Sequence, residues 1–241
     1  MLVKTHAIVL NTLRYGDSQV IVSLFTESHG RLSFIQKASR SPRCAVKRQL
    51  FQPLTLLDVE FDYRPHRGLL RIKEASIGVP FVSLPFDPYK LSIALFLAEF
   101  TAHGTVSEQS DRALYAFLYY SVRWIDACRG GFGNFHIVYM LHVTRFMGFY
   151  PDLAGYVPGA CFDLRGGCFV GCRPSHADWL APEEAGMIRT LMRLSYSTMH
   201  LMRLTREQRN RIVEVILHYY RLHVPSFPEM KSLPVLRELF G

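Results

Sequence analysis

A run of cations between Gly30 and Arg48 is the part of the sequence whose residue types and spacing most clearly point to chemistry. It contains six Lys and Arg residues and no Asp or Glu. Such a concentration of positive charge favours a polyanion, and cations on a loop can follow an irregular phosphate backbone. The alternative is a solvated loop that is basic for solubility. The six cations are Arg31, Lys37, Arg40, Arg43, Lys47 and Arg48.

The positive charge of the whole chain is concentrated in its first third. The 241 residues carry a net charge of +8. Residues 1–80 contain 12 Lys and Arg against 6 Asp and Glu, whereas the remainder contains 16 against 14. The composition, 49% hydrophobic and 20% charged, is that of a folded globular protein. A polyanionic partner is therefore expected for the N-terminal third.

Five strands must position these cations. Short β-branched and apolar runs are separated by turn signals, and they span residues 4–12, 19–26, 31–37, 50–61 and 69–77. Five strands within about 80 residues predict a small closed barrel of the OB-fold type, which binds single-stranded nucleic acid on one face and on its loops. Four further cations would widen the footprint on this barrel: Arg14, Arg64, Arg67 and Arg71.

A change of composition at Pro80, Pro85 and Pro88 predicts a linker, after which the apolar period shifts from 2 to about 3.6. Residues 81–241 are therefore expected to form a helical domain, and the fold class is α+β. One helix should begin at Pro88 and the next after a Ser107 or Ser110 cap. Later helices are expected over 134–148, 182–201, 205–223 and 233–240. Gly166-Gly167 predicts a β-hairpin inserted within residues 155–179.

Two groups of side chains could hold a metal ion. Cys161, Cys168, Cys172 and His176 could supply four zinc ligands, but the cysteines do not form C-x-x-C pairs. Buried cysteines acting as small apolar side chains are the favoured alternative. The acids Asp58, Glu60 and Asp62 alternate along one strand, a pattern that suits Mg²⁺ but is more typical of the polar face of a barrel strand. We predict no metal and no cofactor.

No catalytic motif is present. The sequence lacks a Walker A loop, a G-x-G-x-x-G after a strand and a G-x-S-x-G. A non-enzymatic role is therefore expected, with a hydrolase assembled from distant residues as a weaker alternative. Four arginines could form a second polyanion contact or an ordinary solvated helix surface: Arg203, Arg206, Arg209 and Arg211.

The compartment is expected to be the cytoplasm. The N-terminus lacks a signal-peptide pattern, because its apolar run is broken at Asn11. No stretch approaches the roughly 20 apolar residues of a membrane helix. The five cysteines are an odd number without secreted-scaffold spacing, which favours reduced thiols.

Four segments resemble the RecO family of bacterial recombination mediators, and the resemblance covers nearly the full length. The most specific is 8–32, with Arg14-Tyr15-Gly16-Asp17-Ser18 followed by Leu24-Phe25-Thr26-Glu27-Ser28-His29-Gly30. Residues 50–54 (Leu-Phe-Gln-Pro-Leu) are similar to the start of the family's fourth strand. Residues 146–153 and 231–239 are similar to a helix end and to the C-terminal segment of the family.

The resemblance implies an OB-fold followed by a helical domain, and a non-catalytic mediator of DNA repair associated with the nucleoid. Members bind single- and double-stranded DNA and anneal complementary strands. With RecR they help to load recombinase onto DNA coated by single-strand-binding protein (SSB), whose acidic-hydrophobic tail binds the helical domain. RecF is a further possible partner. Many members carry a four-cysteine zinc element where this chain has the three cysteines of residues 161–172.

The resemblance also maps the family's basic strand and loop onto the six cations of residues 31–48. One alternative function stays open, which is an adaptor whose main role is protein–protein docking and whose DNA binding is incidental.

Overall fold

The computed structural model describes residues 1–16, 19–37, 48–65, 68–105 and 109–239, with the backbone alone for residues 48 and 49. The chain forms two compact units, which are described separately. Unit 1 contains residues 1–127 and 230–239, and unit 2 contains residues 128–229. The boundary predicted at residue 80 separates the strands from the helices, whereas the two compact units are defined by their internal contacts. The boundary at residue 80 therefore stays a prediction.

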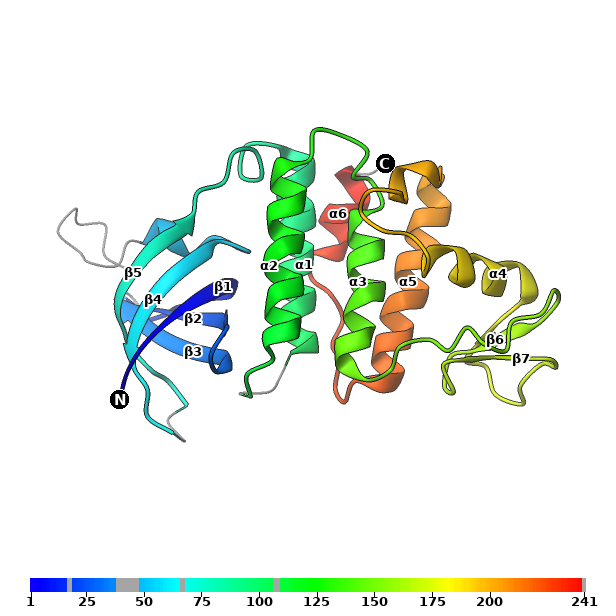
Figure 1. The fold of residues 1–241 in the computed structure, drawn as a ribbon, viewed down its shortest axis with the longest axis horizontal. Coiled ribbons are helices and arrows are strands. Elements are labelled where there is room, and N and C mark those ends of the chain that lie inside the picture. The colour runs from blue at the N-terminus through cyan, green and yellow to red at the C-terminus, as the bar shows by residue number, and fades with distance from the viewer. Residues whose placement is uncertain (17–18, 38–47, 66–67, 106–108, 240–241) are drawn as a thin grey trace. The chain divides into compact units, whose positions relative to one another are not determined.

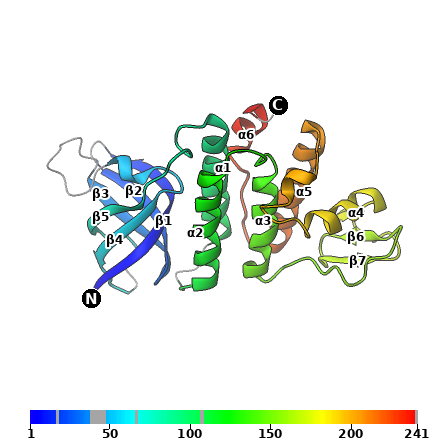
Figure 2. The same ribbon diagram turned by 45° about the horizontal axis from the view of Figure 1, so that its top comes forward.

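Unit 1 contains a five-stranded antiparallel barrel (Figures 1 and 2). Its strands are β1 (Leu2–Tyr15), β2 (Gln19–Thr26), β3 (Gly30–Lys37), β4 (Leu56–Asp62) and β5 (Ile72–Val79), in the order β3-β2-β1-β4-β5. The sheet closes where Leu70, just before β5, runs parallel to β3: Ile35 N donates to Leu70 O (2.9 Å) and Leu70 N to Ser33 O (3.0 Å). The predicted OB-fold is confirmed.

The barrel core is formed by the inward-facing residues of alternating strands. Val20, Val22 and Leu24 are buried along β2, and the rings of Phe34 and Phe61 meet edge to face at 5.0 Å. Successive residues of a strand point to opposite sides, so the residues between these buried ones face out of the barrel. The hydrophobic alternation in the sequence therefore determines which side chains remain available for a ligand.

The fourth strand is shorter than predicted. Residues 48–51 form a 3₁₀ helix and β4 begins only at Leu56, so the expected strand at 50–55 was wrong. Pro53 has no backbone N–H for a ladder, and Leu54 adopts a positive φ of 60°. These two residues delay the start of the strand.

The helices of unit 1 are α1 (Pro88–Gly104), α2 (Arg112–Ala127) and α6 (Leu233–Leu239). The Asp87 carboxylate accepts from Tyr89 N and Lys90 N at the start of α1, and Pro88 occupies the first turn as predicted. The expected serine cap of α2 was wrong, because Asp111 accepts from Leu114 N (2.8 Å). An Asp is as good an N-cap as a Ser, and it lies directly before the first helical residue.

Unit 2 contains α3 (Phe135–Met147), α4 (Pro182–Leu191) and α5 (Arg206–His223). The predicted capping box of α5 is confirmed, with Thr205 and Gln208 bonding to each other's backbone N–H. The single helix expected over 182–201 was wrong, since α4 ends at Leu191 and a 3₁₀ helix follows at Met199–Leu201. Between them, Thr198 Oγ1 accepts from Ser195 N (2.9 Å), a local bond that competes with helix formation.

A three-stranded sheet of order β7-β6-β8 completes unit 2, from β6 (Cys161–Asp163), β7 (Cys168–Val170) and β8 (Trp179–Leu180). The predicted hairpin is confirmed, although its loop has four residues, 164–167, rather than two. Gly167 has a φ of +65°, which favours glycine at this position.

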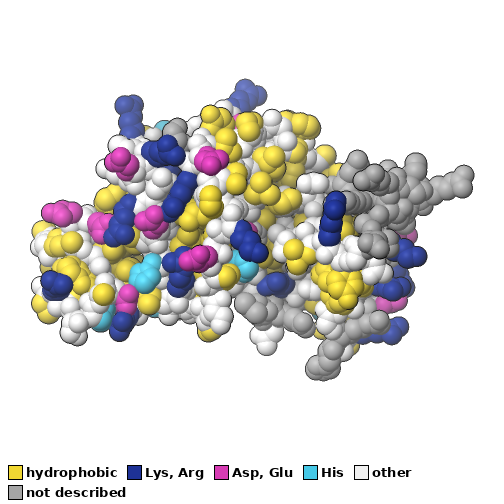
Figure 3. All heavy atoms as spheres, turned by 180° about the vertical axis from the view of Figure 1, so that it is seen from behind, with side chains coloured by type: hydrophobic (Ala, Val, Ile, Leu, Met, Phe, Trp, Pro, Cys, Tyr) yellow, Lys and Arg dark blue, Asp and Glu magenta, His cyan; other side chains and the backbone are white. Residues whose placement is uncertain are grey.

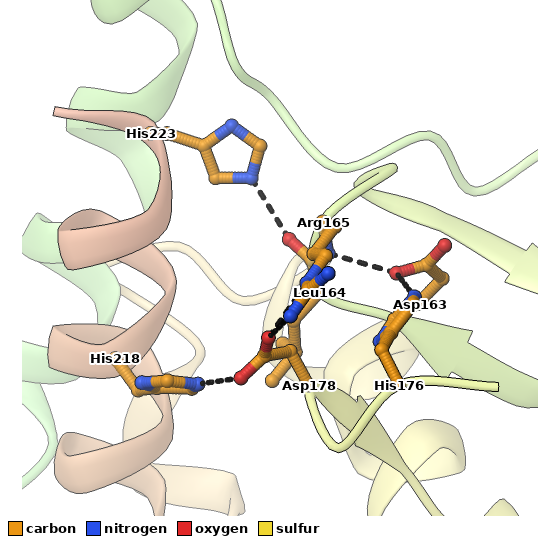
Figure 4. A network of polar contacts seen from close by, with 7 residues as sticks. All are labelled: Asp163, Leu164, Arg165, His176, Asp178, His218 and His223. Atoms are coloured by element: carbon orange, nitrogen blue, oxygen red, sulfur yellow. Dashed lines mark hydrogen bonds and ion pairs between the residues drawn. The ribbon is translucent and has the colours of Figure 1, made fainter. Parts of the chain in front are cut away.

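Polar contacts attach this hairpin to α5 (Figure 4). The Asp178 carboxylate accepts from Arg165 Nε (2.6 Å) and contacts His218 Nε2 (2.8 Å), while His223 Nε2 lies 2.9 Å from Leu164 O. Hydrogen bonds from Arg165 and then His218 lower the pKa of the Asp178 carboxyl. The network therefore serves to hold a loop-rich insertion against a helix.

No helix in the ranges the structure covers is long and apolar enough to cross a bilayer.

Candidate nucleic-acid interface

The outer side of strands β1, β2 and β3 forms a continuous surface whose rows follow from strand register. Leu13 pairs with Ile21 and Ile21 with Ile35, which gives an apolar row across three strands. The next outward row is Tyr15, Gln19 and Lys37. We call these six residues the β1–β3 face.

The β1–β3 face has no acidic side chain. Residues 9–15, 19–26 and 30–37 contain no Asp or Glu. Leu13 and Tyr15 are 57% and 54% exposed, although both are large and apolar in character. A ring beside an apolar row can stack on a base, and a Lys at the edge can meet a phosphate. The surface corresponds to the strands and adjoining loops with which OB-folds bind single strands.

The opposite side of the barrel, which we call the β4–β5 face, neutralises its own charges. It has two ion pairs, Lys4 with Glu60 (2.8 Å) and Lys73 with Asp62 (2.9 Å), and a contact of 2.5 Å between His6 Nδ1 and Asp58 Oδ1. The hydrogen bond with Lys73 lowers the pKa of the Asp62 carboxyl, and that with Glu60 raises the pKa of Lys4. Each of the three alternating acids thus has a basic side chain as its partner. No group of three His, Cys, Asp or Glu residues in the described ranges could hold a metal ion.

Nine of the ten predicted DNA-binding cations divide into three groups. Lys37 is exposed in the outward row of Tyr15, whereas Arg14 pairs with the buried Val20 and is exposed at the same end of the barrel. Arg64 and Arg71 are exposed in the connection from β4 to β5, and Arg71 follows the residue that pairs with β3. The remaining loop positions, Arg40, Arg43, Lys47 and Arg67, lie outside the described residues, as does the side chain of Arg48.

Arg31 has a different position. Its side chain is half-buried, and Nη1 donates to Ala102 O (2.5 Å) and Thr105 O (3.4 Å). Burial lowers the pKa of its guanidinium. The last carbonyls of a helix have no partner within the helix, and a cation beside them is favourable. Arg31 therefore joins β3 to the end of α1.

Sequence reasoning identified the cations but missed the row of Leu13, Ile21 and Ile35 and the exposed Tyr15. A signal was present, because the three strands alternate between inward and outward residues. The register between strands, which brings these residues into one row, was not available from the sequence.

The four arginines singled out in the C-terminal region do not form one cationic surface. Arg211 is paired with Glu184, with Nε–Oε1 and Nη2–Oε2 distances of 2.6 and 3.0 Å. Arg209 is partly buried and donates to Asn134 Oδ1 and Leu204 O. Arg203 and Arg206 are exposed. On the left of Figure 3, where unit 2 lies, cationic and acidic side chains are interspersed.

Unit 2 contains an apolar cavity of about 320 Å³ between α3, α4, α5 and the small sheet. Met187, Ile188 and Leu191 line it from α4, and Ile212 and Val215 from α5. Its polar lining residues are Glu184, Glu207, Gln208 and Arg211. A cavity of this size and polarity can accept a few apolar side chains of a peptide.

The cysteines of the hairpin lie in three different environments. Cys161 is buried, Cys168 is half-buried and Cys172 is exposed, and all three are free thiols. His176 Nε2 lies 3.4 Å from Asp163 Oδ1. These contacts describe the hairpin and assign no metal to it.

Comparison with known proteins matches both parts of the chain. Residues 1–81 match the family description "Recombination protein O N terminal", and residues 85–234 match "Recombination protein O C terminal". The chain is 49% identical to the DNA repair protein RecO of Phocaeicola vulgatus and 47% identical to that of Bacteroides fragilis. It is 32% identical to the DNA repair protein RecO of Flavobacterium psychrophilum. Each alignment covers 100% of both chains.

The fold and these matches first define a class, that of proteins with an N-terminal OB-fold barrel followed by a helical region. Within this class, the chain belongs to the RecO family of DNA repair proteins.

Proposed function

We propose that the protein is a non-catalytic recombination mediator that binds single- and double-stranded DNA and anneals complementary strands. Together with RecR, and with RecF as a possible further partner, it assists recombinase loading on SSB-coated DNA in the cytoplasm, at the nucleoid. The observation that supports this most directly is the acid-free β1–β3 face, with Tyr15 and Lys37 exposed on it and Arg14 exposed at the same end of the barrel.

Charge neutralisation provides the mechanism. Two phosphate backbones repel each other, and a cationic surface that holds both lowers this repulsion so that base pairing can proceed. Phosphate contacts carry no sequence information, so binding should be nearly independent of sequence. If six phosphates are contacted, the logarithm of single-strand affinity should fall with the logarithm of salt concentration at a slope of about −4.

A strand-annealing assay across a salt series tests the proposal. We expect annealing of complementary oligonucleotides to be accelerated at low salt and to decline steeply as salt rises. Single-strand affinity should be measured in parallel, so that loss of binding is separated from loss of annealing. Acceleration that is independent of salt, or no acceleration at any salt, would contradict the charge-neutralisation mechanism.

The apolar cavity of unit 2 supports the proposal that the acidic-hydrophobic tail of SSB docks there. Its apolar lining suits the hydrophobic residues of the tail. Arg211, which also lines the cavity, is the cation that would contact a tail carboxylate. Because Arg211 is already paired with Glu184, the tail must compete for it. We expect Glu184→Gln to strengthen binding of an SSB tail peptide.

The same docking proposal has a second test on one helix. Ile188→Glu places a charge in the cavity and should abolish tail binding, whereas Thr190→Glu, at an exposed position of α4, should not. Calorimetric titration with the tail peptide measures both. Equal binding by the two variants would remove the cavity from the proposal.

The adaptor alternative is favoured by one observation, which is the same cavity. Neutralising Arg40, Arg43 and Lys47, which lie outside the described residues, separates the two functions. A mediator loses annealing in this triple variant while its tail binding persists. If the protein is an adaptor, the triple variant keeps its partner binding and its role in the cell. Annealing by the variant would in that case equal annealing by the parent protein.

A further inference from the structure

Strand β5 forms an open edge of the barrel sheet. It is the last strand in the order β3-β2-β1-β4-β5, next to β4 (Figure 1). The sheet closes through Leu70, before β5 begins, and Gln36 Nε2 donates to Ile72 O at the first residue of the strand (2.8 Å). In the described part of the chain, no strand pairs with residues 73–79 on the side away from β4. An edge of this kind is a template for an added strand.

The exposure of the inward residues of β5 agrees with the open edge. Ile77 pairs with Leu57, which belongs to the barrel core, so both side chains point to the inner side of the sheet. Leu57 is 1% exposed, whereas Ile77 is 51% exposed. Ala75, the other inward residue of this stretch, pairs with the buried Val59 and is itself only partly buried. The inner side of β5 therefore has apolar side chains that an added strand would cover.

The outer side of β5 has a carboxylate in excess of the nearby cations. Lys4 lies opposite Glu60, and Glu60 lies opposite Glu74, so one lysine serves two acids in this row. The hydrogen bond with Glu60 and, to a smaller extent, the charge of Glu74 raise the pKa of the Lys4 ammonium group. Like charges directly opposite each other on neighbouring strands are unfavourable. A cation on the far side of Glu74 would balance the row.

The two sides of β5 together define the side chains that suit an added strand. Between its two register shifts, β5 is regular from Glu74 to Ile77, and its residues alternate between the two sides. A strand beside this stretch would place an apolar residue next to Ile77 on the inner side. On the outer side it would place a cation next to Glu74. A segment of alternating apolar and cationic residues therefore complements the edge in polarity and in charge.

The same strand of a second copy of this chain complements the edge less well. Over residues 74–77, the outward side chains of β5 are Glu74 and Ser76. β5 of another copy would therefore bring a carboxylate and a hydroxyl to this row but no cation. Two acidic outer sides would also be brought together, and like-charge juxtaposition lowers affinity. The charge of the edge thus favours a basic partner segment over self-association.

We propose that the open edge of β5 binds an extended segment of a partner protein by strand addition. The segment alternates apolar residues, one of which covers Ile77, with Lys or Arg residues, one of which pairs with Glu74. Backbone hydrogen bonds along the edge provide the affinity of such a contact, and the alternating side chains provide its selectivity. The inference does not depend on DNA binding, because no residue of the β1–β3 face takes part in it.

Two short peptides test the proposal on the full-length protein. The probe is a peptide of alternating lysine and valine, and the control is a peptide of alternating glutamate and valine. Calorimetric titration should show binding of the lysine peptide, with the glutamate peptide about tenfold weaker or more. Hydrogen–deuterium exchange followed by mass spectrometry locates the contact. We expect the lysine peptide to slow exchange within residues 73–79 and to leave residues 31–37 unchanged.

Substitutions on each side of the edge measure its contribution. Ile77→Lys should weaken binding of the lysine peptide about tenfold, because it removes the apolar contact and adds a like charge. Leu13→Lys makes the same change at a residue of the β1–β3 face that is 57% exposed, and it should leave peptide binding unchanged. Glu74→Gln should weaken binding about threefold, whereas Glu229→Gln, at an exposed position of unit 2, should not. Thermal unfolding verifies that each variant is folded.

Three results would overturn the inference. Peptide binding that leaves exchange within residues 73–79 unchanged would mean that the peptide contacts side chains without adding a strand. Slow exchange within residues 73–79 in the protein alone would mean that the edge is already covered. Protection that rises with protein concentration in the absence of peptide would identify a second copy as the occupant. The annealing assay tests the proposed function separately, so either result can fail without the other.

Discussion

The β1–β3 face and the β4–β5 face belong to the same barrel, yet they differ in whether carboxylates accompany their cations. On the β4–β5 face, Glu60 and Asp62 are each paired with a lysine of a neighbouring strand, and Asp58 contacts His6. On the β1–β3 face there is no carboxylate, and its cation Lys37 lies in one row with the exposed Tyr15, next to an apolar row.

The difference shows that the position of acids matters as much as the number of cations. A cation paired across two strands contributes little to the field outside the barrel, because its partner cancels it at short range. A cation on an acid-free surface keeps its effect on a phosphate. The net charge of +8 is a sum over the whole chain, so it does not show how differently the two sides of the barrel present their charges.

The largest expected effect comes from removing the two cations exposed at the Tyr15 end of the barrel, and separately two cations of the β4–β5 face. Arg14→Gln with Lys37→Gln should weaken single-strand binding about 100-fold, since a hydrogen bond to a charged group contributes roughly 1.5 kcal/mol and two are lost. Lys4→Gln with Lys73→Gln removes the same charge from the β4–β5 face and should change affinity less than about threefold. Fluorescence anisotropy measures both, and equal losses would show that only net charge matters.

A second effect separates a structural cation from the binding cations. Arg31→Met removes the donors to Ala102 O and Thr105 O, so the free energy of unfolding should fall by roughly 1.5 kcal/mol. Arg14→Met, at an exposed position, should change it by less than about 0.5 kcal/mol. Urea denaturation followed by circular dichroism makes the comparison. A larger loss of stability in the Arg14 variant would contradict the role assigned to Arg31.

A single acid placed in the apolar row should act nearly as strongly. Ile21→Asp puts a carboxylate where a strand would lie, and like charges in contact are costly, so we expect single-strand affinity to fall about tenfold. Ile77→Asp is the matched control, because Ile77 is an exposed isoleucine on β5. Its affinity should stay within about twofold of the parent. The comparison would fail if Ile77→Asp were the more damaging change.

The smallest expected effect concerns acid stability. Because Lys73 lowers the pKa of Asp62 in the folded protein, this carboxylate stabilises the fold above its ordinary pKa of 3.8 and loses that contribution as the pH falls through the lowered value. Asp62→Asn should therefore have a slightly lower Tm than the parent at neutral pH. The gap should close in acid. A gap that is constant with pH would mean that the ion pair makes no contribution.

Local patterns made most of the fold predictable from sequence. The alternating strands, the Gly166-Gly167 hairpin and the Thr205–Gln208 capping box all depend on residues close in sequence. The errors also had local causes, in Pro53 and Leu54 before β4 and in Ser195 and Thr198 after α4. These residues interrupt patterns that the apolar periodicity alone would continue.

The candidate site was only partly predictable because it depends on distant residues. The sequence named Arg31 as a binding cation, but its partners Ala102 and Thr105 are some seventy residues away. The row of Leu13, Ile21 and Ile35 exists only once three strands are in register. Neither the Arg31 contacts nor this row can be inferred from residue spacing along the chain.

Ultraviolet cross-linking of the protein to oligothymidylate, followed by peptide mapping, tests the central claim most directly. The account predicts that, among barrel peptides, cross-links occur within residues 9–15, 19–26 and 30–37, with Tyr15 prominent. Cross-links concentrated instead within residues 56–62 and 72–79 would show that the ion-paired side binds DNA and would contradict the account.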